Sequence, residues 1–159
     1  MKRFIYIVSV ITVIAFFTNS AGAMGIFQSD VGYIPMPQTN ISLTITDNLG
    51  VRTAVEHGSI DGKDYIAGYE GLILNVIPLK NIQSISFTKT TDAPKTLMAK
   101  LDNNPLMAII HLKDKAVLSL FVDGSLICYG KTPYGYVRIK LVSIDSIEDL
   151  KFLEKEKTP

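Results

Sequence analysis

Two periods of hydrophobic positions run along the chain and predict its elements. From residue 41 onward apolar and polar residues alternate, as at Ile41, Leu43 and Ile45, which is typical of half-buried strands. Turn signals such as Asp47-Asn48-Leu49-Gly50 interrupt the alternation. Strands are therefore predicted over 41–46, 51–57, 65–69, 72–79 and 83–88, and again over 106–112, 116–122, 125–129 and 136–141.

A nine-residue phrase occurs twice and shows that the chain is internally duplicated. Residues 77–85 read IPLKNIQSI and residues 139–147 read IKLVSIDSI, with identical residues at five positions. A second, shorter repeat precedes each copy, with Gly-Ser-Ile at 58–60 and Gly-Ser-Leu at 124–126. Repetition of this kind predicts two copies of one structural unit.

A spacing of three residues inside the phrase predicts a local break in the strand. Leu79, Ile82 and Ile85 cannot share one face of a regular strand, because strand side chains alternate with period two. One turn of 3₁₀ helix has the required period and commonly serves as a connector. Each copy is therefore expected to be four strands, a 3₁₀ turn and a last short strand.

Five strands with a 3₁₀ turn before the last resemble the plan of an SH3-like small barrel. The predicted fold class is all-β, with two tandem modules of this kind over 39–88 and 105–154. A connector over 89–104 joins them, and its residues 96–101 fit either a helical turn or a strand. One duplicated barrel or sandwich built from both copies is the alternative. Because units of about 45 residues bury little apolar surface, we expect the copies to share an interface.

The C-terminal segment favours a short helix. From residue 143 the apolar positions Ile144, Ile147, Leu150 and Leu153 keep a spacing of three, with mostly polar residues between them. Helix propensity and period agree there, so a helix over 146–154 is preferred to a strand. Residues 155–159 are expected to form a charged tail.

The N-terminal segment predicts export. Lys2 and Arg3 precede an apolar run over 4–17, and Ala21 and Ala23 form a cleavage pattern. The run falls short of the ~20 residues that span a bilayer, so a signal peptide over 1–23 is preferred to an uncleaved anchor. No other run of such length follows, and no transmembrane segment is expected after cleavage. The protein should be periplasmic or secreted.

The mature chain is predicted to start with an arm and to be nearly neutral. Residues 24–38 combine Gly and Pro with apolar side chains, which favours an extended arm laid over the protein. Loss of Lys2 and Arg3 lowers Lys+Arg from 16 to 14 against 15 Asp+Glu. A nearly neutral net charge gives no excess of positive charge with which to attract nucleic acid or anionic lipid. The only cysteine, Cys128, is expected to be a small core hydrophobe, with an intermolecular disulfide as the alternative.

The chemistry-bearing residues do not form an enzyme signature. His57 and His111 are the only histidines, and no further Cys or His stands at ligand spacing, so neither a metal nor a cofactor is expected. The nucleophile motifs G-x-S-x-G and H-E-x-x-H are missing. The sequence therefore predicts a protein that is not an enzyme.

Tyrosines supply the candidate binding residues. Five of the seven fall in the predicted loop before the long strand of each copy, and an arginine lies nearby. Exposed tyrosines suit recognition surfaces, although rings that cover barrel ends are the alternative. The candidate ligand-binding residues are Tyr65, Tyr69, Tyr129, Tyr134, Tyr136 and Arg138.

These observations lead to one expected function and two alternatives. The expectation is an exported, non-enzymatic binding or adaptor protein of the cell envelope that contacts a polypeptide or a cell-wall polymer. A structural subunit of an envelope complex, or a homo-oligomer joined through strand edges, is the alternative. An enzyme whose site is not visible in linear motifs is the third hypothesis.

Overall fold

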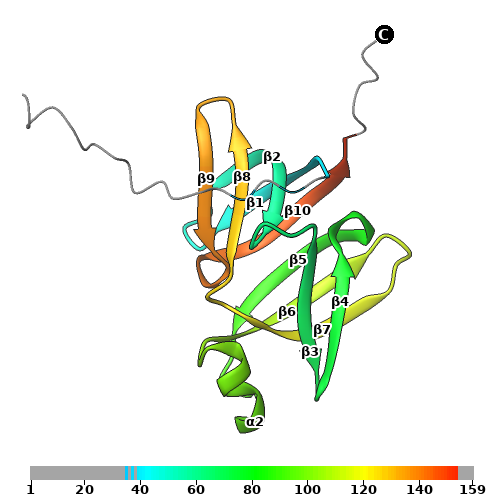
Figure 1. Cartoon of the computed structure of the whole chain (residues 1–159), viewed down its shortest axis with the longest axis vertical. Helices are drawn as coiled ribbons and strands as arrows, with labels where there is room; N and C mark the ends of the chain where they lie inside the picture. The colour runs from blue at the N-terminus through cyan, green and yellow to red at the C-terminus, as the bar shows by residue number, and fades with distance from the viewer. Residues whose placement is uncertain (1–34, 36, 38, 154–159) are drawn as a thin grey trace, which may run out of the picture. The chain divides into compact units, whose positions relative to one another are not determined.

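The protein is all-β, and its strands form one curled, barrel-like sheet (Figure 1). The computed structural model describes residues 35, 37 and 39–153, so the predicted signal peptide, most of the arm and the tail lie outside the described residues. All strand pairs are antiparallel, in the order β4-β3-β7-β6-β5-β10-β1-β2-β8-β9. The strands are β1 (Ile41–Asp47), β2 (Arg52–Ile60), β3 (Tyr65–Glu70), β4 (Ile73–Pro78), β5 (Ile82–Lys89), β6 (Pro105–Leu112), β7 (Val117–Asp123), β8 (Ile127–Thr132), β9 (Gly135–Lys140) and β10 (Ile144–Phe152).

The predicted 3₁₀ turns are confirmed in both copies. The turn η1 (Leu79–Asn81) precedes β5, and η3 (Leu141–Ser143) precedes β10. Each turn begins with a fully buried leucine, which explains the first three-residue step of the repeated phrase. Within the connector, residues 96–101 are helical, as α2 (Lys95–Met98) followed by the 3₁₀ turn η2 (Ala99–Leu101).

The predicted C-terminal helix is wrong, because residues 144–152 form β10. Ile144, Ile147 and Leu150 are all buried although they are three residues apart. The register of β10 against β1 shifts twice, and each shift leaves one extra residue on β10. A β-bulge adds one residue between two inward-facing positions and so turns a period of two into a step of three.

Two five-stranded halves meet at the pairing of β5 with β10. One half, called here the continuous half, contains β3 to β7, and the other, the split half, contains β1, β2, β8, β9 and β10. At the joint, Ile85 pairs with Ile147, and both are fully buried. These residues occupy the same position in the two copies of the repeated phrase. The halves are therefore related by an approximate two-fold axis that passes between them.

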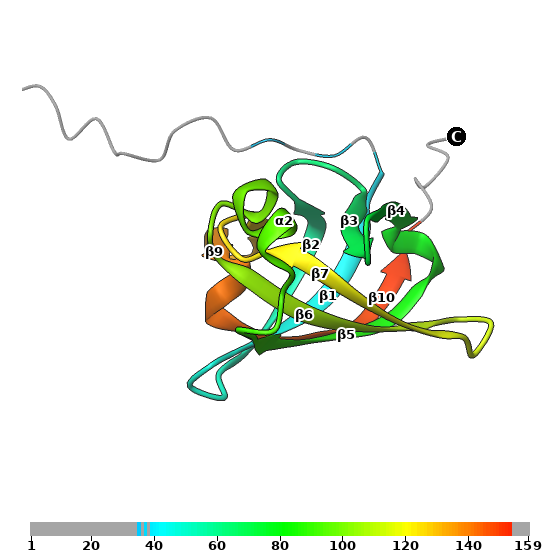
Figure 2. The ribbon, with the colours of Figure 1, turned by 90° about the horizontal axis from the view of Figure 1, so that it is seen from below.

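The two halves of the sheet do not follow the boundaries of the sequence repeat. The predicted modules over 39–88 and 105–154 each give strands to both halves, because the hairpin β3–β4 pairs with β7 and the hairpin β8–β9 pairs with β2. Figure 2 shows β5, β6 and β7 of the continuous half side by side, with α2 next to β7. The links 61–64 and 124–126 are short in both copies, so alternation alone does not determine which partner each hairpin joins.

One hydrophobic cluster extends through both halves and contains Cys128. Burial raises the pKa of the Cys128 thiol to about 12, so the thiol is neutral at physiological pH. The prediction that this cysteine acts as a small core hydrophobe is confirmed. Gly68 in β3 and Gly130 in β8 let the exchanged hairpins approach β7 and β2 closely, because a Cβ at either position would collide with the facing strand.

Candidate functional site

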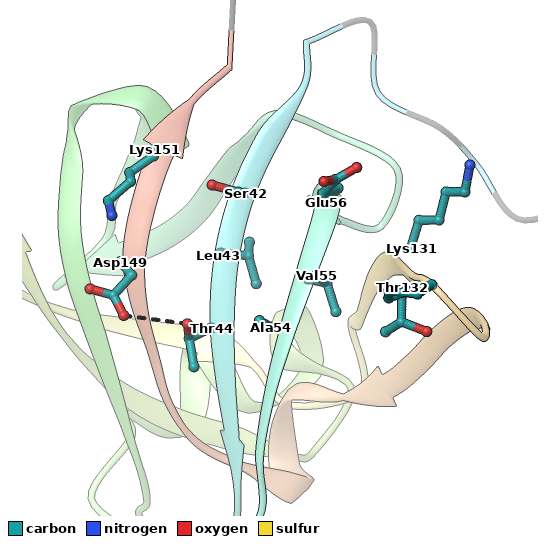
Figure 3. A pocket seen from close by; sticks show the side chains of 11 residues that line it. Ser42, Leu43, Thr44, Ala54, Val55, Glu56, Lys131, Thr132, Asp149 and Lys151 are labelled. Carbon is teal, nitrogen blue, oxygen red and sulfur yellow. Dashed lines mark hydrogen bonds between the residues drawn. The ribbon is translucent and has the colours of Figure 1, made fainter.

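An open groove of about 700 Å³ lies on the split half, over β1, β2, β8 and β10 (Figure 3). Its walls come from strands that are far apart in the sequence and adjacent in the sheet. Side chains of both charges and several hydroxyl groups surround it. The lining residues are Ser42, Leu43, Thr44, Ala54, Val55, Glu56, Lys131, Thr132, Pro133, Asp149 and Lys151.

Charged groups stand on both sides of the groove. Figure 3 shows Asp149 and Lys151 along β10 on one side and Lys131 on the other, with Glu56 on β2 between them. Glu56 and Lys131 are directly opposite in the register of β2 and β8. Within the described part of the chain, the one ion pair joins Arg52 to Glu148. The four charged side chains of the groove therefore form no ion pair with one another.

A β-bulge shapes the β10 side of the groove. Asp149 has a φ of 56°, a left-handed conformation that is uncommon for residues other than glycine. The extra residue at this point bends β10 and returns Leu150 to the core. The Thr44 hydroxyl donates a hydrogen bond to Asp149 Oδ2 at 3.3 Å. Bulges with strained backbone occur frequently beside functional sites, and here the bulge places a carboxylate in the groove wall.

The surface of the continuous half that is equivalent to the groove, on β3 and β7, is apolar and partly covered. Phe121 on β7 and Tyr69 on β3 are directly opposite, in the position that Glu56 and Lys131 have in the split half. The turn η2 contacts β7, and Lys100 Nζ lies 5.3 Å from the centre of the Tyr69 ring. The two halves thus differ at equivalent positions of the sheet. The continuous half has a covered apolar face there, and the split half has an open polar groove.

Two of the predicted tyrosines flank the groove. Tyr136 on β9 pairs with the groove residue Lys131 and is 52% exposed. Tyr134 follows Pro133 at the tip of the β8–β9 hairpin and is fully exposed. Each tyrosine is thus next to a groove residue, Tyr134 in the sequence and Tyr136 in the sheet, although neither lines the groove.

The other predicted residues lie elsewhere, and most of the tyrosines are not in loops. Tyr129 is buried in β8 opposite the exposed Arg138, and Tyr69 lies beneath Lys100. Tyr65 on β3 borders a second cavity of about 310 Å³, with Lys63 Nζ 5.5 Å from its ring centre. Of the five, only Tyr134 occupies a turn, and the other four lie in β3, β8 and β9, where the alternation also predicted strands.

Sequence reasoning missed the charged residues of the groove. Glu56, Lys131, Asp149 and Lys151 belong to β2, β8 and β10, and no linear motif joins them. Only the strand order brings them together, so the sequence carried no signal that could have identified them as a group. Each one by itself reads as an ordinary polar position on the solvent face of a strand.

Residues 35, 37 and 39–153 contain neither a metal-binding cluster nor a membrane-spanning helix. No group of three or more His, Cys, Asp or Glu side chains in this part of the chain could hold a metal ion. His57 lies at the irregular part of β2, where its backbone N–H donates to Asn40 Oδ1 at 3.1 Å, and His111 is exposed on β6. Within the same residues, no helix is long and apolar enough to cross a membrane.

The fold and the groove define an all-β protein with two barrel-like halves, one of which carries an open polar cleft. Residues 37–155 match a family model described as "Uncharacterised protein", and the chain belongs to that family. No curated protein and no solved structure matches the chain.

Proposed function

We propose that this protein is an exported, non-enzymatic binding protein of the cell envelope whose groove holds an extended polypeptide. The contrast between the two halves carries the proposal. Equivalent positions are apolar and covered in the continuous half, whereas in the split half they are polar and border a groove of about 700 Å³. A duplicated scaffold that leaves one copy of a surface open and hydrophilic is suited to bind a ligand there.

The chemistry of the groove favours a polypeptide over a cell-wall glycan. None of its eleven lining residues is aromatic, so its floor offers no ring on which a sugar could stack. Glu56 and Lys131 offer one carboxylate and one ammonium group, and Thr132 adds a hydroxyl. An extended peptide carries alternating donors and acceptors and side chains of both charges, which such a surface can recognise.

Export and the absence of catalysis rest on the sequence. The basic start, the apolar run over 4–17 and the Ala21–Ala23 pattern support cleavage and release from the cytoplasm. The missing nucleophile motifs and the lack of clustered histidines favour binding without chemistry. The nearly neutral charge of the mature chain supports a protein or neutral polymer partner over nucleic acid.

Selection from a random peptide display library tests the groove directly. The processed chain should enrich a set of related peptides, and Lys131→Glu should weaken their binding at least tenfold. The matched control is Lys115→Glu, an exposed lysine in the β6–β7 turn that lies outside the groove. Soluble cell-wall fragments serve as the second probe. If no peptide is enriched, or if both lysine variants bind equally well, the proposal that the groove binds a polypeptide is wrong.

A structural role is the second candidate, and one specific observation favours it. Within the described residues, β4 has a neighbouring strand on one side only, and it carries exposed apolar side chains, with Leu74 53% and Val76 54% accessible. An uncovered apolar strand edge is unusual in a monomer, because it invites pairing with another strand.

A further inference from the structure

A further cavity, called here the β5 cavity, continues the groove on the other side of β10. It has a volume of about 430 Å³ and lies over β5, β10 and the turn between β6 and β7. The groove and the β5 cavity share two residues of β10, Asp149 and Lys151. Figure 3 shows both side chains on β10, across the groove from Lys131. A single strand therefore separates the two hollows, and its side chains border both of them.

The register of the sheet places residues of both hollows in one row across the strands. Thr44 on β1, which lines the groove, pairs with Glu148 on β10. On the other side of β10, Ile147 pairs with Ile85, so the next step of this antiparallel register brings Ser84 on β5 beside Glu148. Ser84 and Glu148 both line the β5 cavity. A segment that follows this row crosses β10 and occupies both hollows.

The row is longer than the groove alone. Neighbouring strands are about 4.8 Å apart, so the three spacings from β8 to β10 measure about 14 Å and the four from β8 to β5 about 19 Å. An extended polypeptide advances about 3.3 Å per residue. The groove therefore accommodates about four extended residues, and the two hollows together accommodate about six.

We propose that the β5 cavity is a second binding site for the polypeptide held in the groove, and that the ligand crosses β10 to fill both. This inference rests on the proposed function and specifies its ligand, an extended segment of at least about six residues. The segment runs across the strands and contacts their outward side chains. It does not extend the sheet by pairing with an edge strand, which is the usual way in which a sheet binds a peptide.

The side chains at the crossing match the main chain of a polypeptide. Asp149 offers a carboxylate acceptor and Lys151 an ammonium donor, as an amide N–H and a carbonyl of the ligand require. Beyond them, Gln83 and Ser84 add an amide and a hydroxyl, each of which can donate and accept. Lys113 Nζ donates to a backbone carbonyl at 2.8 Å and borders the cavity at the β6–β7 turn.

The length of the bound peptide tests the second site. A ten-residue peptide enriched by display on the processed chain should lose at least tenfold in affinity, measured by fluorescence anisotropy, when it is shortened to four residues. Ser84→Arg fills the β5 cavity and should weaken the long peptide at least tenfold. The short peptide should bind this variant as it binds wild type, which also shows that the variant is folded.

Ser86→Arg is the matched control. Ser86 lies on the same face of β5 as Ser84, is exposed and is not a residue of the cavity wall. The control variant should bind both peptides as wild type does. A Ser84→Arg variant that binds the long peptide as well as the Ser86→Arg variant does would overturn the second site.

Photo-cross-linking maps the path of the peptide on the unaltered chain. The shortest peptide that keeps full affinity is made with a benzophenone at one end or the other, and the adducts are located by mass spectrometry. One end should attach to Gln83, Ser84 or Lys113, and the other end to the β8–β9 hairpin. Adducts of both ends at groove residues alone would overturn the proposal.

Failure of the second site and failure of the peptide groove give different results. If Lys131→Glu weakens peptide binding and Ser84→Arg does not, the groove stands and the second site is wrong. If no peptide is enriched, the proposed function and the second site are both wrong.

Discussion

Gly130 in β8 offers a direct test of the strand order, because it faces a strand from the other repeat. A Cβ at this position would lie 2.5 and 2.6 Å from two side-chain carbons of Val55 on β2. Carbon atoms normally approach to about 3.5 Å, so Gly130→Ala must push β2 and β8 apart by about 1 Å. Overpacking of this kind costs about 1–3 kcal/mol, and the lower entropy of the unfolded alanine chain offsets about 0.4–1 kcal/mol of it. We expect the free energy of unfolding to fall by about 1–2 kcal/mol.

A double-mutant cycle identifies the partner strand. Val55→Ala alone should cost about 2 kcal/mol, because it removes two buried methyl groups and leaves a small cavity. Combined with Gly130→Ala, it should cost less than the sum by about 1 kcal/mol, since the new methyl group enters part of the vacated space. Leu120→Ala on β7 is the matched control and should add to Gly130→Ala within about 0.5 kcal/mol.

Urea unfolding followed by circular dichroism measures each corner of the cycle. If β8 paired with β7 of its own repeat, Gly130 would couple to Leu120 and not to Val55, and the exchanged strand order would be refuted. A Gly130→Ala variant as stable as wild type would refute the close approach itself. The equivalent pair provides a second test, because a Cβ at Gly68 would lie 2.9 Å from Leu120 Cβ.

Four further predictions follow from exposure, backbone conformation and charge. Tyr134→Ala should change the free energy of unfolding by no more than about 0.5 kcal/mol, because the ring is fully exposed; a larger loss in a thermal melt would contradict a solvent-facing role. The buried Cys128 thiol should react with a disulfide reagent only on unfolding. Because burial raises its pKa from 9.0 to about 12, stability should fall as pH rises above 9, less steeply in Cys128→Val, and equal slopes would contradict this. Asp149→Val should cost about 1–2 kcal/mol in urea unfolding and Asp149→Gly much less, since glycine tolerates positive φ; equal losses would exclude backbone strain as the cause. Arg52→Ala should lose at most about 1 kcal/mol, and high salt should abolish the difference, because the pair with Glu148 is solvent-exposed.

The local pattern of the chain was sufficient for most of the elements. Alternation identified the strands, and the three-residue step after Leu79 and Leu141 identified both 3₁₀ turns, because side-chain period follows from backbone geometry alone. The same step failed after Ile144. A bulge and a helical turn both place the third residue on the same side, and only the pairing with β1 shows which of the two is present.

The sequence by itself determined the class of fold, the duplication and the two 3₁₀ turns. Its expectations of export and of a binding role remain predictions. The tertiary structure decided which hairpin pairs with which strand, and that choice depends on contacts between residues more than 60 positions apart, such as Val55 with Gly130. The groove follows from that choice. Sites assembled from separate strands become visible only when the sheet order is known, because no local pattern records which strands are neighbours.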